Sequence, residues 1–217
     1  MTLQTNIPVH EMVYRKLRDL ILFGEIAPGQ AVTIQGLVER LDAGMTPVRE
    51  AIRRLTSEGA LNLQGNRRII VPELSDQNMA ELYFLRKTLE PQLISLATAR
   101  AEKEDIERLS RIDADLDNAI NTGDINLYLR QNYEFHKELY RLADAPILEA
   151  VADGLWMRYG PSLRVVCGRI GTLGLADQHK ETLTAMSVGD AEKAAEAILA
   201  DVTQGIDQIK SSILCKY

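Results

Sequence analysis

The stretch TPVREAIRRL, residues 46–55, has the pattern of a short helix with two different faces. Thr46 is a residue type that caps helix starts, and Pro47 suits a first helical turn. The apolar residues recur at helical spacing: Val48, Ile52 and Leu55. The other face carries Arg49 and Arg53, four residues apart. This face is either the solvated side of an ordinary helix or a surface that enters the groove of a nucleic acid.

The flanking segments predict two more helices and a β-hairpin. Residues 10–24 (HEMVYRKLRDLILFG) and 33–44 (TIQGLVERLDAG) place apolar residues at helical spacing, and Gly44 is expected to end the second helix in a tight turn. Residues 60–74 (ALNLQGNRRIIVPEL) have the alternation of two strands around a Gln-Gly-Asn turn, with two arginines near the tip. Three short helices followed by a basic hairpin indicate a winged helix-turn-helix, whose third helix occupies the DNA major groove.

Every segment beyond the hairpin has a helical pattern. Ser75 can cap the first of these helices. The amphipathic segments are 76–101, 103–121, 124–143, 145–159, 175–188 and 190–213. Pro91 lies inside the first segment, where proline can kink a helix, and residues 160–174 show no clean period. The predicted fold class is therefore mainly α: a winged helix-turn-helix domain at 1–74 joined to an all-helical bundle at 75–217.

Charge is distributed unevenly along the chain. The formal net charge is −6, but the first 74 residues hold nine basic and eight acidic residues. Five arginines fall within twenty residues of that part: Arg49, Arg53, Arg54, Arg67 and Arg68. The acidity therefore belongs to the helical part, and the third helix and the hairpin share a local basic face.

Composition excludes several classes of protein. Hydrophobic residues make up 46% of the chain, which is enough for a buried core. The apolar runs are shorter than the ~18 residues of a membrane helix, and the start MTLQTNIPVHE lacks the regions of a signal peptide, so a soluble, cytoplasmic protein is expected. Cys167 and Cys215 are the only cysteines and form no CxxC pattern, which indicates ordinary thiols rather than a zinc or redox site.

Two histidines of the helical part have an informative setting. In NYEFHKELY, Asn132 and His136 are four residues apart and share one helical face, while His179 and Asp201 lie in later helices. Imidazole and carboxylate groups that project from several helices into a bundle can bind a metal ion. Histidines of helical domains are more often hydrogen-bonded, partly buried residues, and the pattern alone favours that interpretation.

Residues 9–74 resemble the DNA-binding domain of the GntR family of bacterial transcription regulators. The resemblance rests on the run TPVREAI and on Leu17, Ile21, Gly24, Pro28, Gly29, Leu37, Leu41, Leu55, Glu58 and Gly59. The remaining chain is similar to the all-helical, ligand-sensing FCD domain of the FadR subfamily. Its marks are LRKTLEP (85–91), NYEFHKELY (132–140) and HKETLTAMSVGDAEKA (179–194).

The resemblance implies a divalent metal site in the helical domain. Carried over by position, its ligands are Asn132, His136, His179 and Asp201. Asp201 departs from the family pattern, which has a histidine there. An oxygen donor makes the ligand set harder, so the site is expected to prefer manganese or magnesium over zinc or nickel more than the usual family site does.

The resemblance also implies contacts to DNA. Arg49 is the expected base or phosphate contact, and the positioning contacts are Arg40, Thr46, Arg53, Arg67 and Arg68. Arg53 and Arg54 have an alternative interpretation as a solvated face paired with Glu50 or Glu58. Met45 stands where the family commonly has an arginine, and methionine offers neither a bidentate pair to guanine nor a charge for phosphate, so half-site preference is expected to differ.

An effector with a carboxylate group is expected in the helical domain. Arg86 can hold it, because a guanidinium forks onto a carboxylate, and the alternative is an internal pair with Glu90. Tyr128 and Arg158 are further candidates.

These observations together predict a regulator that binds a palindromic, double-stranded DNA operator as a homodimer and responds to an organic acid. The competing enzyme hypothesis is an all-helical, metal-dependent hydrolase that uses His136, His179 and Asp201. It gives the TPVREAI block no role. An architectural DNA-binding protein, the third class, does not explain the large acidic domain.

Overall fold

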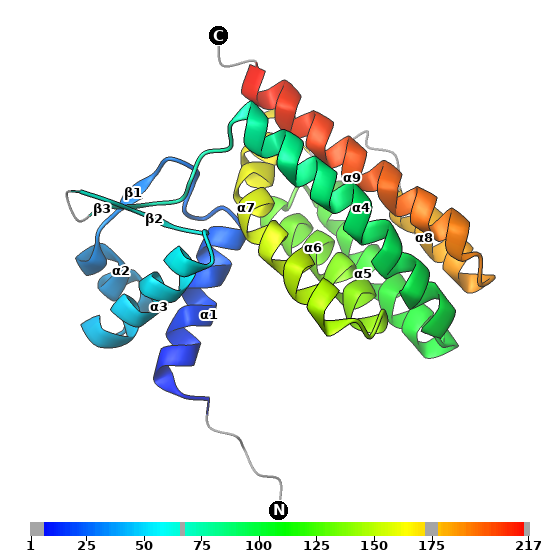
Figure 1. Ribbon diagram of the computed structural model, residues 1–217, viewed down its shortest axis with the longest axis horizontal. Coiled ribbons are helices and arrows are strands. Elements are labelled where there is room, and N and C mark those ends of the chain that lie inside the picture. The colour runs from blue at the N-terminus through cyan, green and yellow to red at the C-terminus, as the bar shows by residue number, and fades with distance from the viewer. Residues whose placement is uncertain (1–6, 66–67, 172–177, 215–217) are drawn as a thin grey trace, which may run out of the picture.

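The computed structural model describes residues 7–65, 68–171 and 178–214, and it begins with a winged helix-turn-helix (Figure 1). Its helices are α1 (Val9–Leu22), α2 (Ile34–Leu41) and α3 (Met45–Ser57). Its antiparallel sheet contains β1 (Ala31–Val32), β2 (Asn62–Gln64) and β3 (Arg68–Ile70) in the order β1-β3-β2. The predicted fold class and hairpin are confirmed. Strand β1 was missed because two residues are too few to show an alternating pattern.

The turn between α2 and α3 differs from the prediction in its details. Helix α2 ends at Leu41, and Asp42 rather than Gly44 adopts the left-handed conformation, with φ of 48°. Gly44 has the extended backbone of a helix N-cap, so α3 begins at Met45 and Thr46 lies inside its first turn. The prediction that Thr46 caps this helix was therefore wrong by two residues, which is a common error at helix boundaries.

The helical part contains α4 (Asp76–Arg100), α5 (Lys103–Thr122), α6 (Ile125–Leu142), α7 (Pro146–Ile170), α8 (Gln178–Ser187) and α9 (Ala191–Leu214). Ser75 caps α4 as expected, in a reciprocal capping box with Asn78. Helix α4 runs through Pro91 without ending. The expected start of the helix 175–188 and Cys215 lie outside the described residues.

Helix α7 is longer than its predicted range of 145–159. It continues through Pro161 to Ile170, across most of the stretch that showed no clean period. The reason is burial on several sides, because Pro161, Leu163, Val166 and Cys167 are all buried. A helix covered on several faces has no single apolar stripe for periodicity to detect.

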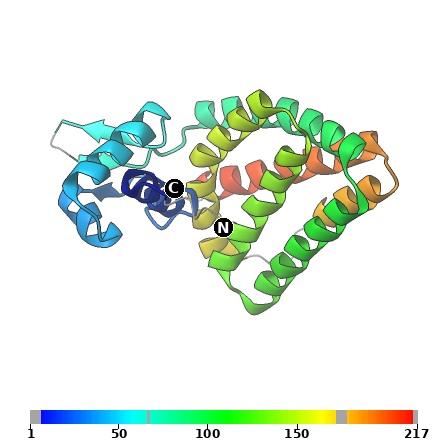
Figure 2. The same cartoon turned by 90° about the horizontal axis from the view of Figure 1, so that it is seen from below.

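The winged helix lies at one end of the helical bundle (Figure 2). Helix α1 packs against both α3 and α7, so the core continues from the winged helix into the bundle. Within the bundle α4 lies along α9, and α5 lies along α6 (Figure 1). None of the helices in the described residues is long and apolar enough to cross a membrane.

Candidate metal centre and nucleic-acid interface

Three helices bring a possible metal-ligand set together inside the bundle. His136 of α6, His179 of α8 and Asp201 of α9 each offer a ligand atom, and these atoms lie within 4.8 Å of one another. Asp201 Oδ2 is 3.2 Å from His136 Nε2, and Asp201 Oδ1 is 3.8 Å from His179 Nε2. Both histidines are buried, whereas the Asp201 side chain is 21% exposed. Asn132 is buried one helical turn before His136, on the same side of α6.

Each histidine also faces a buried carboxylate with its other ring nitrogen. His136 Nδ1 is 3.1 Å from Glu90 Oε2, and His179 Nδ1 is 3.3 Å from Asp113 Oδ1. Neither carboxylate was predicted from the sequence to contact a histidine. A signal for Asp113 existed, because it occurs at helical spacing between Leu109 and Leu116, on the buried face of α5.

The Nε2 atoms of His136 and His179 are buried and have no hydrogen-bond partner among the described residues. A buried polar atom without a partner costs on the order of 1–3 kcal/mol. Both atoms lie near the Asp201 carboxylate, while both Nδ1 atoms face Glu90 or Asp113. Metal-binding histidines have this arrangement, in which a carboxylate orients the ring and the other nitrogen binds the ion. The residues present therefore fit a divalent cation.

The His136 ring lies between the carboxylates of Glu90 and Asp201. Burial alone would lower the pKa of His136, but Asp201 and Glu90 outweigh burial and raise the pKa to about 9. Burial would raise the pKa of Glu90, but Arg86 and then His136 lower it to about 2. The pKa of Asp201 is also lowered to about 2, because His136, His179 and Arg86 outweigh burial. The two carboxylates therefore hold a proton on His136, and a divalent cation that binds this imidazole has to displace that proton.

Arg86 extends this group toward α7. It is buried and forms an ion pair with Glu90, which is the alternative that the sequence left open. Its guanidinium carbon lies 4.9 Å from the centre of the Trp156 ring and 4.1 Å from that of Tyr159. Its Nη1 atom has no hydrogen-bond partner within the described part of the chain. The guanidinium therefore carries a buried donor whose hydrogen-bonding capacity is not used within those residues.

The other two effector candidates differ in their placement. Tyr128 is buried on α6, and burial raises its pKa well above the ordinary value. Arg158 is exposed and lies against Gly59, the glycine that follows α3, where its guanidinium leaves no room for a side chain. It lines a cavity of about 350 Å³ at the junction of the winged helix and the bundle. The structure therefore does not bring Arg158 to the histidine site, because α7 presents it on the opposite side from buried Trp156.

Helix α3 presents the candidate nucleic-acid interface. Thr46, Arg49 and Arg53 are exposed on it, and the two arginines have no ion pair or hydrogen bond in the described ranges. Both line a groove of about 910 Å³ between α3, the start of α2 and β2. Arg68 is exposed on β3, while Arg67 lies outside the described residues.

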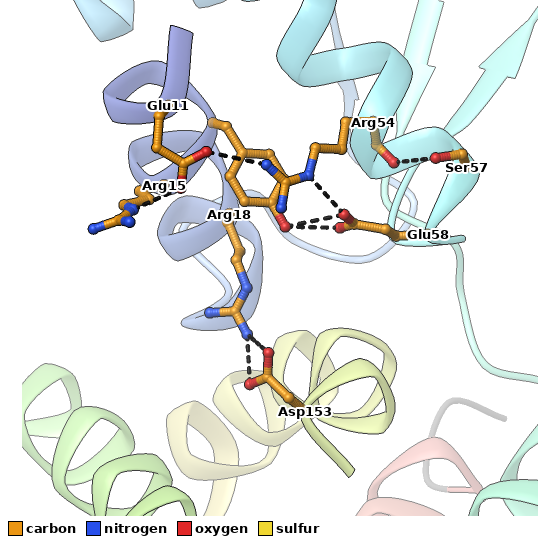
Figure 3. A network of polar contacts seen from close by, with 8 residues as sticks. Glu11, Arg15, Arg18, Arg54, Ser57, Glu58 and Asp153 are labelled. Atoms are coloured by element: carbon orange, nitrogen blue, oxygen red, sulfur yellow. Dashed lines mark hydrogen bonds and ion pairs between the residues drawn. The ribbon is translucent and has the colours of Figure 1, made fainter. Parts of the chain in front are cut away.

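Two other arginines of this domain are engaged within the protein. Arg40 pairs with Glu25 at 3.0 Å. Arg54 lies 3.5 Å from the centre of the Tyr14 ring and pairs with Glu58 and Glu11 at 3.1 Å each (Figure 3). The proposed pairing with Glu58 thus holds for Arg54.

A polar contact joins the winged helix to the bundle. Arg18 of α1 pairs with Asp153 of α7 at 2.6 Å (Figure 3) and donates to the Tyr133 hydroxyl at 3.1 Å. Tyr133 meets Trp156 edge-on at 5.4 Å, and Trp156 meets His136 edge-on at 5.2 Å. Contacting rings therefore connect the histidine site to α1. No local sequence signal indicated this link, because Arg18 and Asp153 are 135 residues apart.

Comparisons with known proteins agree with both parts of the structure. Residues 9–71 match the model of the gntR family of bacterial regulatory proteins, and residues 81–204 match the FCD domain. The HTH-type transcriptional regulator McbR of Escherichia coli (strain K12) is 28% identical over 198 residues, which cover 89% of each chain. A probable D-xylose utilization operon transcriptional repressor of Paenarthrobacter nicotinovorans is 25% identical over 86% of this chain and 84% of its own. The solved structure of E. coli McbR/YncC has a TM-score of 0.89 and 26% identity, and the match covers 94% of this chain and 98% of that one.

Proposed function

Because the chain belongs to the GntR family of bacterial transcription regulators and carries an FCD domain, we propose that it is a regulator whose operator affinity depends on a divalent metal ion and an acidic metabolite. The family and the relatives identify a DNA-binding regulator and not an enzyme, so the hydrolase alternative is discarded. One observation carries the proposal of metal control: two buried histidine nitrogens, which have no hydrogen-bond partner in the described part of the chain, lie beside an ionised carboxylate.

In the proposed sensor site His136, His179 and Asp201 hold the metal, and Asn132 is a fourth, neutral donor. Two imidazoles and one carboxylate leave coordination positions open, and an acidic metabolite can fill them. The free side of the Arg86 guanidinium supplies a second contact for the carboxylate of that metabolite. Tyr128 remains a candidate contact on α6.

The contact between Arg18, Tyr133 and Asp153 supports a route from this site to DNA. Tyr133 follows Asn132 directly and packs on Trp156, which also packs on His136. A shift of α6 on binding therefore moves the partner of Arg18. The metal and the metabolite would bind more tightly to one arrangement of α1 against the bundle than to the other. Operator affinity would then change, because the two arrangements bind the operator with different affinities.

Replacing Arg49 by alanine is expected to weaken operator binding by about 1–3 kcal/mol, because this exposed side chain reaches base edges from the major-groove helix. Arg68→Ala should mainly lower the salt slope by about one, because it removes one phosphate contact. Fluorescence anisotropy over a salt series measures both. Arg54→Ala is the matched control, since Arg54 is bound to Tyr14 and Glu58 and should not change the slope. If Arg49→Ala bound the operator as tightly as the wild type, the placement of α3 in the major groove would be contradicted.

We further propose that the regulator is a homodimer on a palindromic operator. A single winged helix reads only one half-site, and two-fold dimers gain specificity by reading two. Sedimentation at micromolar concentration is expected to give a mass near twice the chain mass of 24.2 kDa. A monomer both with and without DNA would contradict the proposal.

A further inference from the structure

The DNA-facing side of α3 begins with an apolar residue. Met45 is the first residue of the helix and is 47% exposed. It precedes Arg49 by one helical turn, so the two side chains share a face, and both line the groove of about 910 Å³. Ile52, two turns after Met45 on the same side of the helix, lines this groove too but is only 4% exposed, and Val48 beside it is 0% exposed. Met45 is thus far more exposed than the apolar residues next to it that form the core.

An exposed methionine at this position restricts what it can recognise. The first residues of a recognition helix are those that contact base edges. Methionine carries no charge for phosphate and no donor for guanine or adenine. The thymine C5-methyl group is the apolar feature that standard base pairs present in the major groove. The residue before Met45 is Gly44, which has no side chain to intervene.

We propose that Met45 reads a thymine methyl group in each half-site, next to the base pair that Arg49 contacts. The proposal rests on the operator binding proposed above and adds a specificity-determining residue to it. Burying one methyl group against the thioether chain is worth about fourfold in affinity per half-site. The half-site is consequently expected to prefer a T·A pair where a helix that begins with arginine would select G·C.

Binding-site selection from random duplexes with the full-length protein supplies the operator, and uracil then replaces each thymine of a half-site in turn. Uracil lacks only the methyl group. We expect one replacement per half-site to weaken wild-type binding about fourfold. Met45→Leu should keep this sensitivity, and Met45→Gln, which has a similar length but a polar end, should lose it. A repeated selection with Met45→Arg should replace that T·A pair by G·C.

Leu63→Ala is the matched control, because Leu63 is 59% exposed on β2 and lines the same groove. It should leave the response to uracil unchanged. Equal wild-type affinity for thymine and uracil at every position overturns the proposal, and so does an undiminished uracil effect in Met45→Gln. Failure to select any sequence would overturn operator binding itself, which is a distinguishable result. Melting temperatures confirm that the exposed substitutions leave the fold intact.

Discussion

His136→Ala and His179→Ala are each expected to abolish the uptake of about one divalent metal ion per chain. Each substitution removes one of the two nitrogens that lie beside Asp201, and a site with one imidazole and one carboxylate binds weakly. In the wild type, metal bound only by the folded state should raise the melting temperature; a concentration of 100 times Kd corresponds to about 2.7 kcal/mol. Elemental analysis and thermal melts with and without chelator provide the measurement.

His10→Ala is the control for this experiment, because His10 is exposed on α1 and should change neither uptake nor melting. Melts with zinc, nickel, manganese and magnesium rank the ions, and the oxygen donor of Asp201 favours manganese more than a third imidazole would. A metal-free wild type that shows no shift with any of these ions would return both histidines to a purely structural role.

A further variant, Arg18→Met, tests whether the contacts of Arg18 couple the metal site to operator binding. Binding linkage requires that the factor by which metal changes operator affinity equals the factor by which DNA changes metal affinity. Arg18→Met keeps the aliphatic part of the side chain but loses the contacts to Asp153 and Tyr133. We expect both factors to move toward one while metal uptake persists. If both factors were unchanged in Arg18→Met, the metal site and the operator would not be coupled through Arg18.

Arg86→Ala is expected to lower the free energy of unfolding by about 3–5 kcal/mol. Arg86 and Glu90 are both 1% exposed, and removal of the arginine leaves a buried carboxylate that has lost its arginine partner but still faces His136. The double variant Arg86→Ala, Glu90→Gln should be less destabilised than Arg86→Ala alone, because it has no uncompensated charge. Urea unfolding measures each value.

A surface pair provides the contrast for Arg86. Arg108 is 38% exposed and pairs with Glu138 at 2.5 Å and also with Asp105. Arg108→Ala should cost at most about 1 kcal/mol, because water screens exposed ion pairs. If Arg86→Ala lowered the free energy of unfolding no more than Arg108→Ala, the buried ion pair would not stabilise the fold as its burial implies.

The sequence by itself determined most of the elements and the exposed, arginine-bearing side of α3, because both depend on local rules. Helical spacing separates Val48 from Arg49, and turn chemistry places a hairpin after Gly59. The resemblance to known regulators also indicated that His136, His179 and Asp201 belong together, and the three lie together in the fold. Local rules failed where a helix is buried on several sides and has no single apolar stripe, as in α7 beyond Gly160.

Only the tertiary structure decided which side chains meet across elements. It paired Glu90 with His136, Asp113 with His179 and Arg18 with Asp153, and it turned Arg158 toward Gly59 instead of the histidine site. Helical periodicity states which residues of one helix share a face, but not which face of a distant helix will cover them. That choice comes from packing the whole core at once, so it is not contained in any single stretch of the chain.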